Sequence, residues 1–121
     1  MLELAVPVWQ SSITVQERCD IERVQRAALN IILGYRYSTY KEALQWFNID
    51  SLEDRRVQLC SKFAHKAVKH DKFKNWFKVN HARTRTRQEQ PKYCHVRARL
   101  GRYQKSPLSY LTAILNCAKK K

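Results

Sequence analysis

Apolar residues recur at helical spacing along most of the chain. Within residues 14–33 they stand three and four positions apart, which predicts an amphipathic helix. Thr14 lies three residues before Glu17, the spacing of a capping box, in which each side chain satisfies a backbone donor of the first turn. Gly34 is expected to end this helix, because glycine adopts positive φ without steric cost. The apolar stripe consists of Ile21, Val24, Ala28, Ile31 and Ile32. On the other faces, Glu22 and Arg26 are spaced to pair.

Two further helices are expected, over residues 40–48 and 52–70. Thr39 and Ser51 precede them as N-caps, whose hydroxyls accept from backbone amides of the first turn. Glu53 and Asp54 suit the positive end of the third helix dipole. We expect the three helices to cover one another's apolar sides, which predicts an all-α fold built as a small bundle. The apolar positions of the second and third helices are Ala43, Leu44, Phe47, Leu52, Leu59, Phe63 and Ala67.

Aromatic residues gather after the third helix. Phe73, Trp76 and Phe77 have helical spacing with lysines between them. We favour a short helix whose aromatic side closes the bundle; the alternative is an aromatic and basic surface for bases and phosphates. At the other end, residues 1–10 are mostly apolar, and Pro7 is expected to end or kink a helix. This segment is expected either to fold back on the core or to continue an upstream element.

The 121 residues have a formal net charge of +14, and the charge is strongly segregated. Residues 1–60 contain seven Lys and Arg against eight Asp and Glu, whereas residues 61–121 contain 17 against two. We therefore expect a helical region at residues 1–78 and a basic, partly disordered loop or linker at residues 79–105. A C-terminal helix at 106–118 would begin with Ser106 as N-cap and proline next.

The basic segment is the candidate binding site. Lysine and arginine neutralise phosphates and release counterions, so the partner expected is RNA or DNA, contacted through its backbone without sequence readout. Arginines in the run RTRTR can also form two bonds to one phosphate. A solvated basic tail is the alternative interpretation. The candidate nucleic-acid-binding residues are Arg83, Arg85, Arg87, Lys92, Arg97, Arg99, Arg102 and Lys105.

Composition argues against several other classes. Two glycines leave no Gly-rich phosphate loop, and the four cysteines contain no CxxC pair. We expect no metal site, no cofactor and no catalytic residue, since the acids serve as caps and exposed helix charges. With no apolar run long enough for a membrane span and no secretory signal, we expect reduced thiols and an intracellular location, nuclear or cytoplasmic.

Six motifs in order resemble the C-terminal region of reverse transcriptases of non-LTR (LINE-class, jockey-like) retrotransposons. The family pattern reads L-E-Y-A-x-P-V-W, then E-x-x-Q-x-x-A-x-R-I-I-L-G, then S-L-x-x-R-R-x-x-L-C. Leu4 stands where the family often has Tyr, and Asn30 where it often has Arg. The motifs are LELAVPVW (2–9), SSIT (11–14), DIERVQRAALNIILG (20–34), YSTYKEAL (37–44), SLEDRRVQLCSKFAHKAV (51–68) and RYQKSPLSYLTAILN (102–116).

The resemblance implies a helical thumb and the region that follows it. In the family, the catalytic aspartates of the Y-A-D-D or F-A-D-D motif belong to the palm, upstream of these motifs, so no catalytic residue is carried over. The resemblance implies a non-catalytic fragment of an RNA-directed DNA polymerase, with the palm and fingers region as a further partner. Two alternatives remain: a retroelement remnant that acts only as a helical protein-interaction module or has no function, and a zinc-dependent module.

Overall fold

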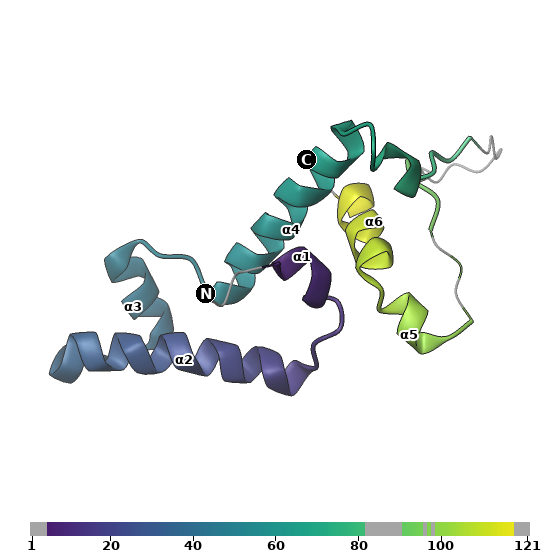
Figure 1. Cartoon of the computed structure of the whole chain (residues 1–121). Helices are drawn as coiled ribbons and strands as arrows, with labels where there is room; N and C mark the ends of the chain where they lie inside the picture. Colours follow the sequence, from purple (N-terminus) through teal and green to yellow (C-terminus); the bar gives the residue numbers. More distant parts are fainter. Residues whose placement is uncertain (1–4, 82–90, 96, 98, 118–121) are drawn as a thin grey trace, which may run out of the picture. The chain divides into compact units, whose positions relative to one another are not determined.

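The computed structural model of the chain is helical, which confirms the all-α class. It describes residues 5–81, 91–95, 97 and 99–117, and within these it contains an isolated β-bridge but no strand (Figure 1). None of the helices in this part is both long and apolar enough to cross a membrane. The α-helices are α1 (Val6–Trp9), α2 (Val15–Leu33), α3 (Tyr40–Phe47), α4 (Leu52–Lys69), α5 (Gly101–Gln104) and α6 (Pro107–Cys117), with 3₁₀ turns η1 (Gly34–Arg36) and η2 (Lys74–Trp76).

The chain divides into two compact units. Unit 2 is continuous and spans Ile13–Gln58, whereas unit 1 combines Met1–Ser12 with Leu59–Lys121. Helix α4 begins in unit 2 and ends in unit 1. The boundaries expected after residues 78 and 105 both fall inside unit 1.

The caps expected from the sequence are present in unit 2. The Thr14 amide donates to Glu17 Oε2 at 2.6 Å, and the Glu17 amide donates to Thr14 Oγ1 at 3.3 Å, which completes the capping box of α2. The Thr14 amide, and then its hydroxyl, lower the pKa of the Glu17 carboxyl. Gly34 follows the helix with φ of 52°. Thr39 Oγ1 accepts from the Glu42 amide in the first turn of α3.

The first turn of α4 is capped partly by side chains of α2. An α-helix leaves its first backbone amides without partners inside the helix. In α4 the first two of these amides donate to α2, and the third donates to the expected N-cap serine. The three bonds are Leu52 N–H to Gln25 Oε1 (3.0 Å), Glu53 N–H to Glu22 Oε1 (2.6 Å) and Asp54 N–H to Ser51 Oγ (3.1 Å).

Tyr40 of α3 joins the same polar network. Its hydroxyl lies 2.6 Å from Glu22 Oε2 and 2.8 Å from Gln25 Oε1, so its proton is shared between two acceptors. The pairing of Glu22 with Arg26 expected from their spacing is wrong. Glu22 Oε1 lies 3.9 Å from Arg56 Nη2, and the Arg26 guanidinium lies over the Tyr40 ring, 5.2 Å from its centroid.

This polar network explains why α2 does not bury the apolar face that its sequence predicts. The apolar stripe of α2 was expected to be buried, yet Val24, Ile31 and Ile32 are 56%, 82% and 66% exposed. The α2 side that packs in unit 2 instead comprises Glu22, Gln25 and buried Leu29, which share a helix face at spacings of three and four. Hydrogen bonds to α3 and to α4 select this face in preference to the more apolar one.

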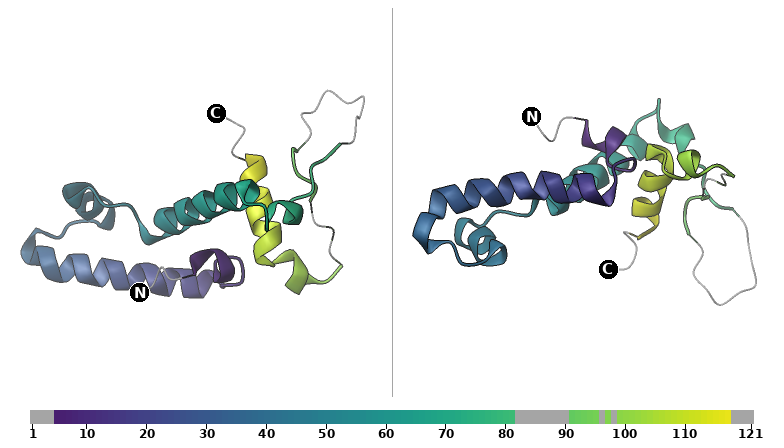
Figure 2. Two further views of the ribbon diagram at one scale, coloured as in Figure 1. Left: turned by 45° about the horizontal axis from the view of Figure 1, so that its top comes forward. Right: turned by 90° about the horizontal axis from the view of Figure 1, so that it is seen from below.

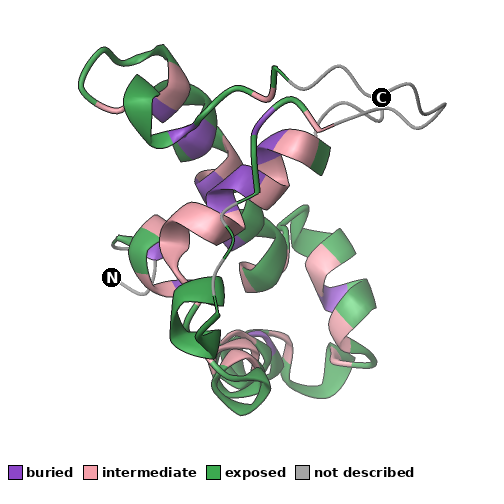
Figure 3. Cartoon of the chain, turned by 90° about the vertical axis from the view of Figure 1, so that its right-hand side faces the viewer, coloured by how far each residue is buried: buried purple, intermediate pink, exposed green. Residues whose placement is uncertain are grey.

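The larger core lies in unit 1. Figures 1 and 2 show α6 beside the C-terminal part of α4. The residues of this core come from α1, α4, α6 and the segments between α4 and α5, and Figure 3 colours the chain by burial. Pro7, expected to end or kink a helix, instead lies in the first turn of α1, where no intrahelical partner for its missing amide hydrogen is needed. The core consists of Val6, Cys60, Ala64, Ala67, Phe77, Tyr93, Leu111 and Leu115.

The aromatic cluster after α4 is divided between core and surface. Phe77 is buried, as expected for an aromatic side that closes the core. Trp76 is 51% exposed, and Phe73 packs edge-on against it with ring centroids 4.8 Å apart. The short helix expected here is the single 3₁₀ turn η2.

Candidate nucleic-acid interface

Tyr93 anchors the basic segment to the core of unit 1. Its ring is 6% exposed and packs edge-on against Phe77, with centroids 6.2 Å apart. Tyr93 falls within the basic loop expected at residues 79–105, but its side chain belongs to the core. Asn116 of α6 supports it from the backbone side: Oδ1 accepts from Tyr93 N–H at 3.0 Å, and Nδ2 donates to Tyr93 O at 3.1 Å.

A short antiparallel pairing extends from this anchor. Val79 and Tyr93 form an isolated β-bridge. Two backbone hydrogen bonds of 2.8 Å flank it, and together they hold residues 78–80 against residues 92–94. These bonds run from Asn80 N–H to Lys92 O and from Cys94 N–H to Lys78 O.

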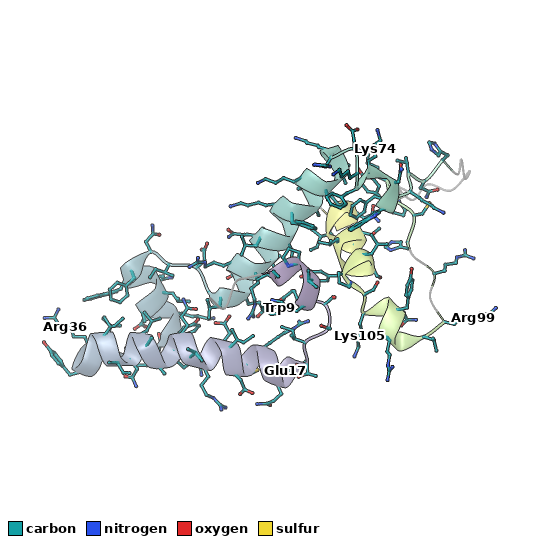
Figure 4. The ribbon with its side chains drawn as sticks, in the orientation of Figure 1. Trp9, Glu17, Arg36, Lys74, Arg99 and Lys105 are labelled. Carbon is teal, nitrogen blue, oxygen red and sulfur yellow. The ribbon has the colours of Figure 1, made fainter. Side chains whose placement is uncertain are left out.

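Five of the eight predicted contact residues lie in the described part of the chain, and all five are exposed. Lys92 precedes the anchor, and its Nζ lies 5.4 Å from the Tyr93 ring centroid. Arg97 and Arg99 lie on the segment before α5, Arg102 lies within α5, and Lys105 ends it; Figure 4 labels Arg99 and Lys105. The other three, Arg83, Arg85 and Arg87, lie outside the described residues.

Positive charge in this unit is barely compensated. Of its described residues, only Asp71 carries a carboxylate side chain, and this lies 2.9 Å from Lys74 Nζ. Glu3 and Glu89, the other acidic residues of the unit, lie outside the described residues. The five described contact candidates form no ion pair with any described residue. A surface on which one sign of charge is so dominant attracts polyanions and raises their rate of encounter.

A second group of cations was left out of the predicted site. Lys62, Lys66 and Lys69 are exposed and lie on one face of α4, because residues three and four apart share a helix face. The opposite face carries the buried core residues Cys60, Ala64 and Ala67. The signal was present in the sequence as lysines at spacings of four and three, but only the later basic segment was assigned to the ligand.

The described residues of the basic segment supply positive charge and hydrogen-bond donors. In the described part of the chain, no group of three or more His, Cys, Asp or Glu could hold a metal ion. All four cysteines are free: Cys60 is buried, and Cys19, Cys94 and Cys117 are exposed. Exposed guanidinium and ammonium groups on a supported segment can hold phosphate groups without any covalent step.

In comparisons with known proteins, no family model, no curated protein and no solved structure matches the chain. Its ligand is therefore inferred from its own residues. The observations that bear on it are the exposed cations, the buried Tyr93 on the same segment and the near absence of carboxylates among the described residues of the unit.

Proposed function

We propose that the chain binds the phosphate backbone of RNA or DNA without sequence specificity and without catalysing a reaction. The observation that carries this proposal is the set of five exposed cations at residues 92–105, which form no ion pair with any described residue and lie on the segment held to the core through Tyr93. Neutralising phosphates releases condensed counterions, and this supplies most of non-specific affinity. If about six phosphates are engaged, the logarithm of affinity falls against that of salt with a slope near −4 on a single strand and near −5 on a duplex.

The test compares two variants that each remove three positive charges. One changes Arg97, Arg99 and Arg102 to Gln in unit 1; the matched control changes Arg23, Arg36 and Lys41 to Gln in unit 2. Fluorescence anisotropy with labelled oligonucleotides is measured at several salt concentrations. The first variant should flatten the slope on a single strand by about 2, equally for all sequences, while the control changes it less.

The parent protein supplies the decisive measurement. An affinity that is unchanged between about 50 and 200 mM salt would refute the electrostatic proposal. A further variant, with Arg83, Arg85 and Arg87 changed to Ala, tests whether the RTRTR run contributes. We expect it to weaken binding similarly for every sequence.

We further propose that the chain derives from a non-LTR retrotransposon reverse transcriptase, as the six ordered motifs support. On this proposal its partners include the palm and fingers region of such an enzyme, and its location is the nucleus or cytoplasm. The chain itself contains no paired-Asp motif. Sequencing the genomic DNA directly upstream tests the origin: an in-frame or decayed palm coding segment supports it, and unrelated intact coding sequence contradicts it.

A second candidate function is a helical protein-interaction module. The observation in its favour is the exposed apolar surface of unit 2, where Val24, Ile31 and Ile32 of α2 and Trp46 of α3 lie open to solvent. Large exposed apolar side chains of this kind are typical of association sites where they gather in one patch. Self-association in sedimentation experiments, together with no retention on heparin or single-stranded DNA at low salt, would favour this function over nucleic-acid binding.

A further inference from the structure

A pocket of about 300 Å³ opens among the cations of unit 1. This volume is at the lower end of the range typical of small-molecule sites. Two half-exposed aromatic rings, a lysine and a histidine contribute to its lining, and no carboxylate does. The lining residues are Trp76, Lys78, Cys94, His95, Tyr103 and Leu108, and all of them lie in the described part of the chain.

The aromatic part of the lining is held from behind while its surface remains available. Trp76 and Tyr103 are 51% and 52% exposed, although large aromatic side chains usually bury most of their surface. Phe73 packs edge-on against Trp76 at an interplanar angle of 62°, and His70 stacks at a tilt against Phe73 with centroids 5.2 Å apart. The indole therefore has support within the protein and an open surface toward the pocket.

The pocket is also built into the predicted interface. The Cys94 amide donates to Lys78 O at 2.8 Å, so two lining residues are fixed to each other by the pairing beside Tyr93. The lining residues alternate along the chain with the predicted phosphate contacts. Cys94 and His95 lie between Lys92 and Arg97, and Tyr103 lies between Arg102 and Lys105.

We propose that this pocket receives an unpaired base of a single-stranded nucleic acid, stacked against Trp76 and Tyr103. This inference rests on the proposed function and names its ligand class. Aromatic side chains stack on any base, so the contact adds affinity without sequence specificity. Lys78 and Arg102 contact the phosphates on either side of the base. A duplex base cannot enter without leaving its stack and its paired base, which is unfavourable, so the pocket favours single strands.

The experiment uses the full chain and four ligands: oligo(dT), a strand of the same length without bases, a duplex of the same length, and thymidine monophosphate. Trp76→Leu removes the stacking surface. Trp46→Leu, which changes an exposed tryptophan of α3 in the other unit, is the matched control. We expect Trp76→Leu to weaken oligo(dT) binding by about 5- to 100-fold and to leave the affinity for the baseless strand unchanged. The control variant should bind both strands with the affinity of the parent.

Two further measurements separate stacking from loss of fold. Trp76→Phe should retain most of the affinity, because phenylalanine also stacks. In a Trp9→Phe, Trp46→Phe background, Trp76 is the remaining tryptophan, and oligo(dT) should quench its fluorescence more than the baseless strand does. Circular dichroism checks that each variant is folded.

Three results would overturn the base pocket. These are unchanged oligo(dT) binding by Trp76→Leu, equal parent affinity for the baseless strand and oligo(dT), and thymidine monophosphate binding as tightly as oligo(dT). In each case salt-dependent binding of the strands would persist, so the proposed backbone binding would survive. Loss of salt-dependent binding by the parent to every polymer would instead refute the proposed function itself.

Discussion

The side-chain amide of Asn116 bonds to both backbone groups of Tyr93, accepting from its N–H at 3.0 Å and donating to its carbonyl at 3.1 Å. Asn116 thus takes the place of a neighbouring strand on the side of Tyr93 that has no backbone partner. Because Tyr93 is buried, groups left without partners there would incur a desolvation cost. A residue at the end of α6 thereby holds the backbone of the basic segment in place at Tyr93.

Asn116→Ala should destabilise unit 1 by about 1–3 kcal/mol, because it leaves two buried backbone groups unpaired. Asn116→Asp keeps the acceptor but places a negative charge beside the Tyr93 carbonyl, so it should be no more stable than the alanine variant. Urea unfolding measures both. Cys117→Ala changes the exposed neighbouring residue and serves as the control. Parent-like stability of Asn116→Ala would show that the two bonds do not support the anchor.

Gln25 has a comparable role in unit 2, where its side-chain oxygen accepts from the first amide of α4. Gln25→Ala should cost about 1–2 kcal/mol, as the loss of a helix cap does. In the Gln25→Ala variant, hydrogen exchange at the Leu52 amide should be faster than in the parent. Gln16→Ala, on the exposed first turns of the same helix, should change stability by less than about 0.5 kcal/mol. Equal effects of the two substitutions would contradict capping of α4 by α2.

The raised pKa of the Tyr40 hydroxyl leads us to expect a loss of stability at alkaline pH. Burial, and then the hydrogen bond to the Glu22 carboxylate, raise the pKa of Tyr40 well above its ordinary value of about 10. A raised pKa means that the protonated hydroxyl is favoured in the folded state. Its stabilisation is therefore complete below about pH 10 and declines as the pH rises above that value.

Tyr40→Phe should remove this part of the pH dependence and cost about 1–2 kcal/mol near neutral pH, since it deletes a hydrogen bond to a charged group. Thermal unfolding between about pH 8 and 11 measures the difference between parent and variant, which should narrow as the pH rises. Tyr35→Phe changes an exposed ring on η1 and should follow the parent. If the difference in stability between the parent and Tyr40→Phe widened as the pH rose, the raised pKa of the Tyr40 hydroxyl would be contradicted.

Local signals in the sequence located the helices well. The hydroxyls of Thr14, Thr39 and Ser51 cap α2, α3 and α4 as expected, because a cap depends on residues only three positions apart. The identity of the buried face could not be read in the same way. For α2 the buried face is decided by hydrogen bonds that Glu22 and Gln25 accept from backbone amides about 30 positions later in the chain. A hydrophobic pattern contains no information about these bonds.

In the candidate site, too, the sequence revealed the local features but not the contacts between distant residues. Its cations were identified from charge alone, since Arg97, Arg99 and Arg102 have no carboxylates nearby in the sequence. The role of Tyr93 was missed because it depends on Phe77 and Asn116, which are 16 and 23 positions away. The pocket likewise joins residues from four separate segments, so no local spacing could have indicated it.

Substituting the lysines of α4 tests whether the ligand also contacts this helix of unit 1. Lys62, Lys66 and Lys69 share a face opposite the buried side of the helix, over a length of about 10 Å at 1.5 Å per residue. If a bound strand continues along this face, changing all three to Gln should flatten the salt slope on a single strand by about 2, from 0.7 for each lost phosphate contact. Stability should not fall, because these ammonium groups are exposed. A salt slope within error of the parent's would show that the ligand does not contact this face of α4 and would leave the predicted basic segment as its site. Charges that only raise the general field alter affinity with little change in the number of counterions released.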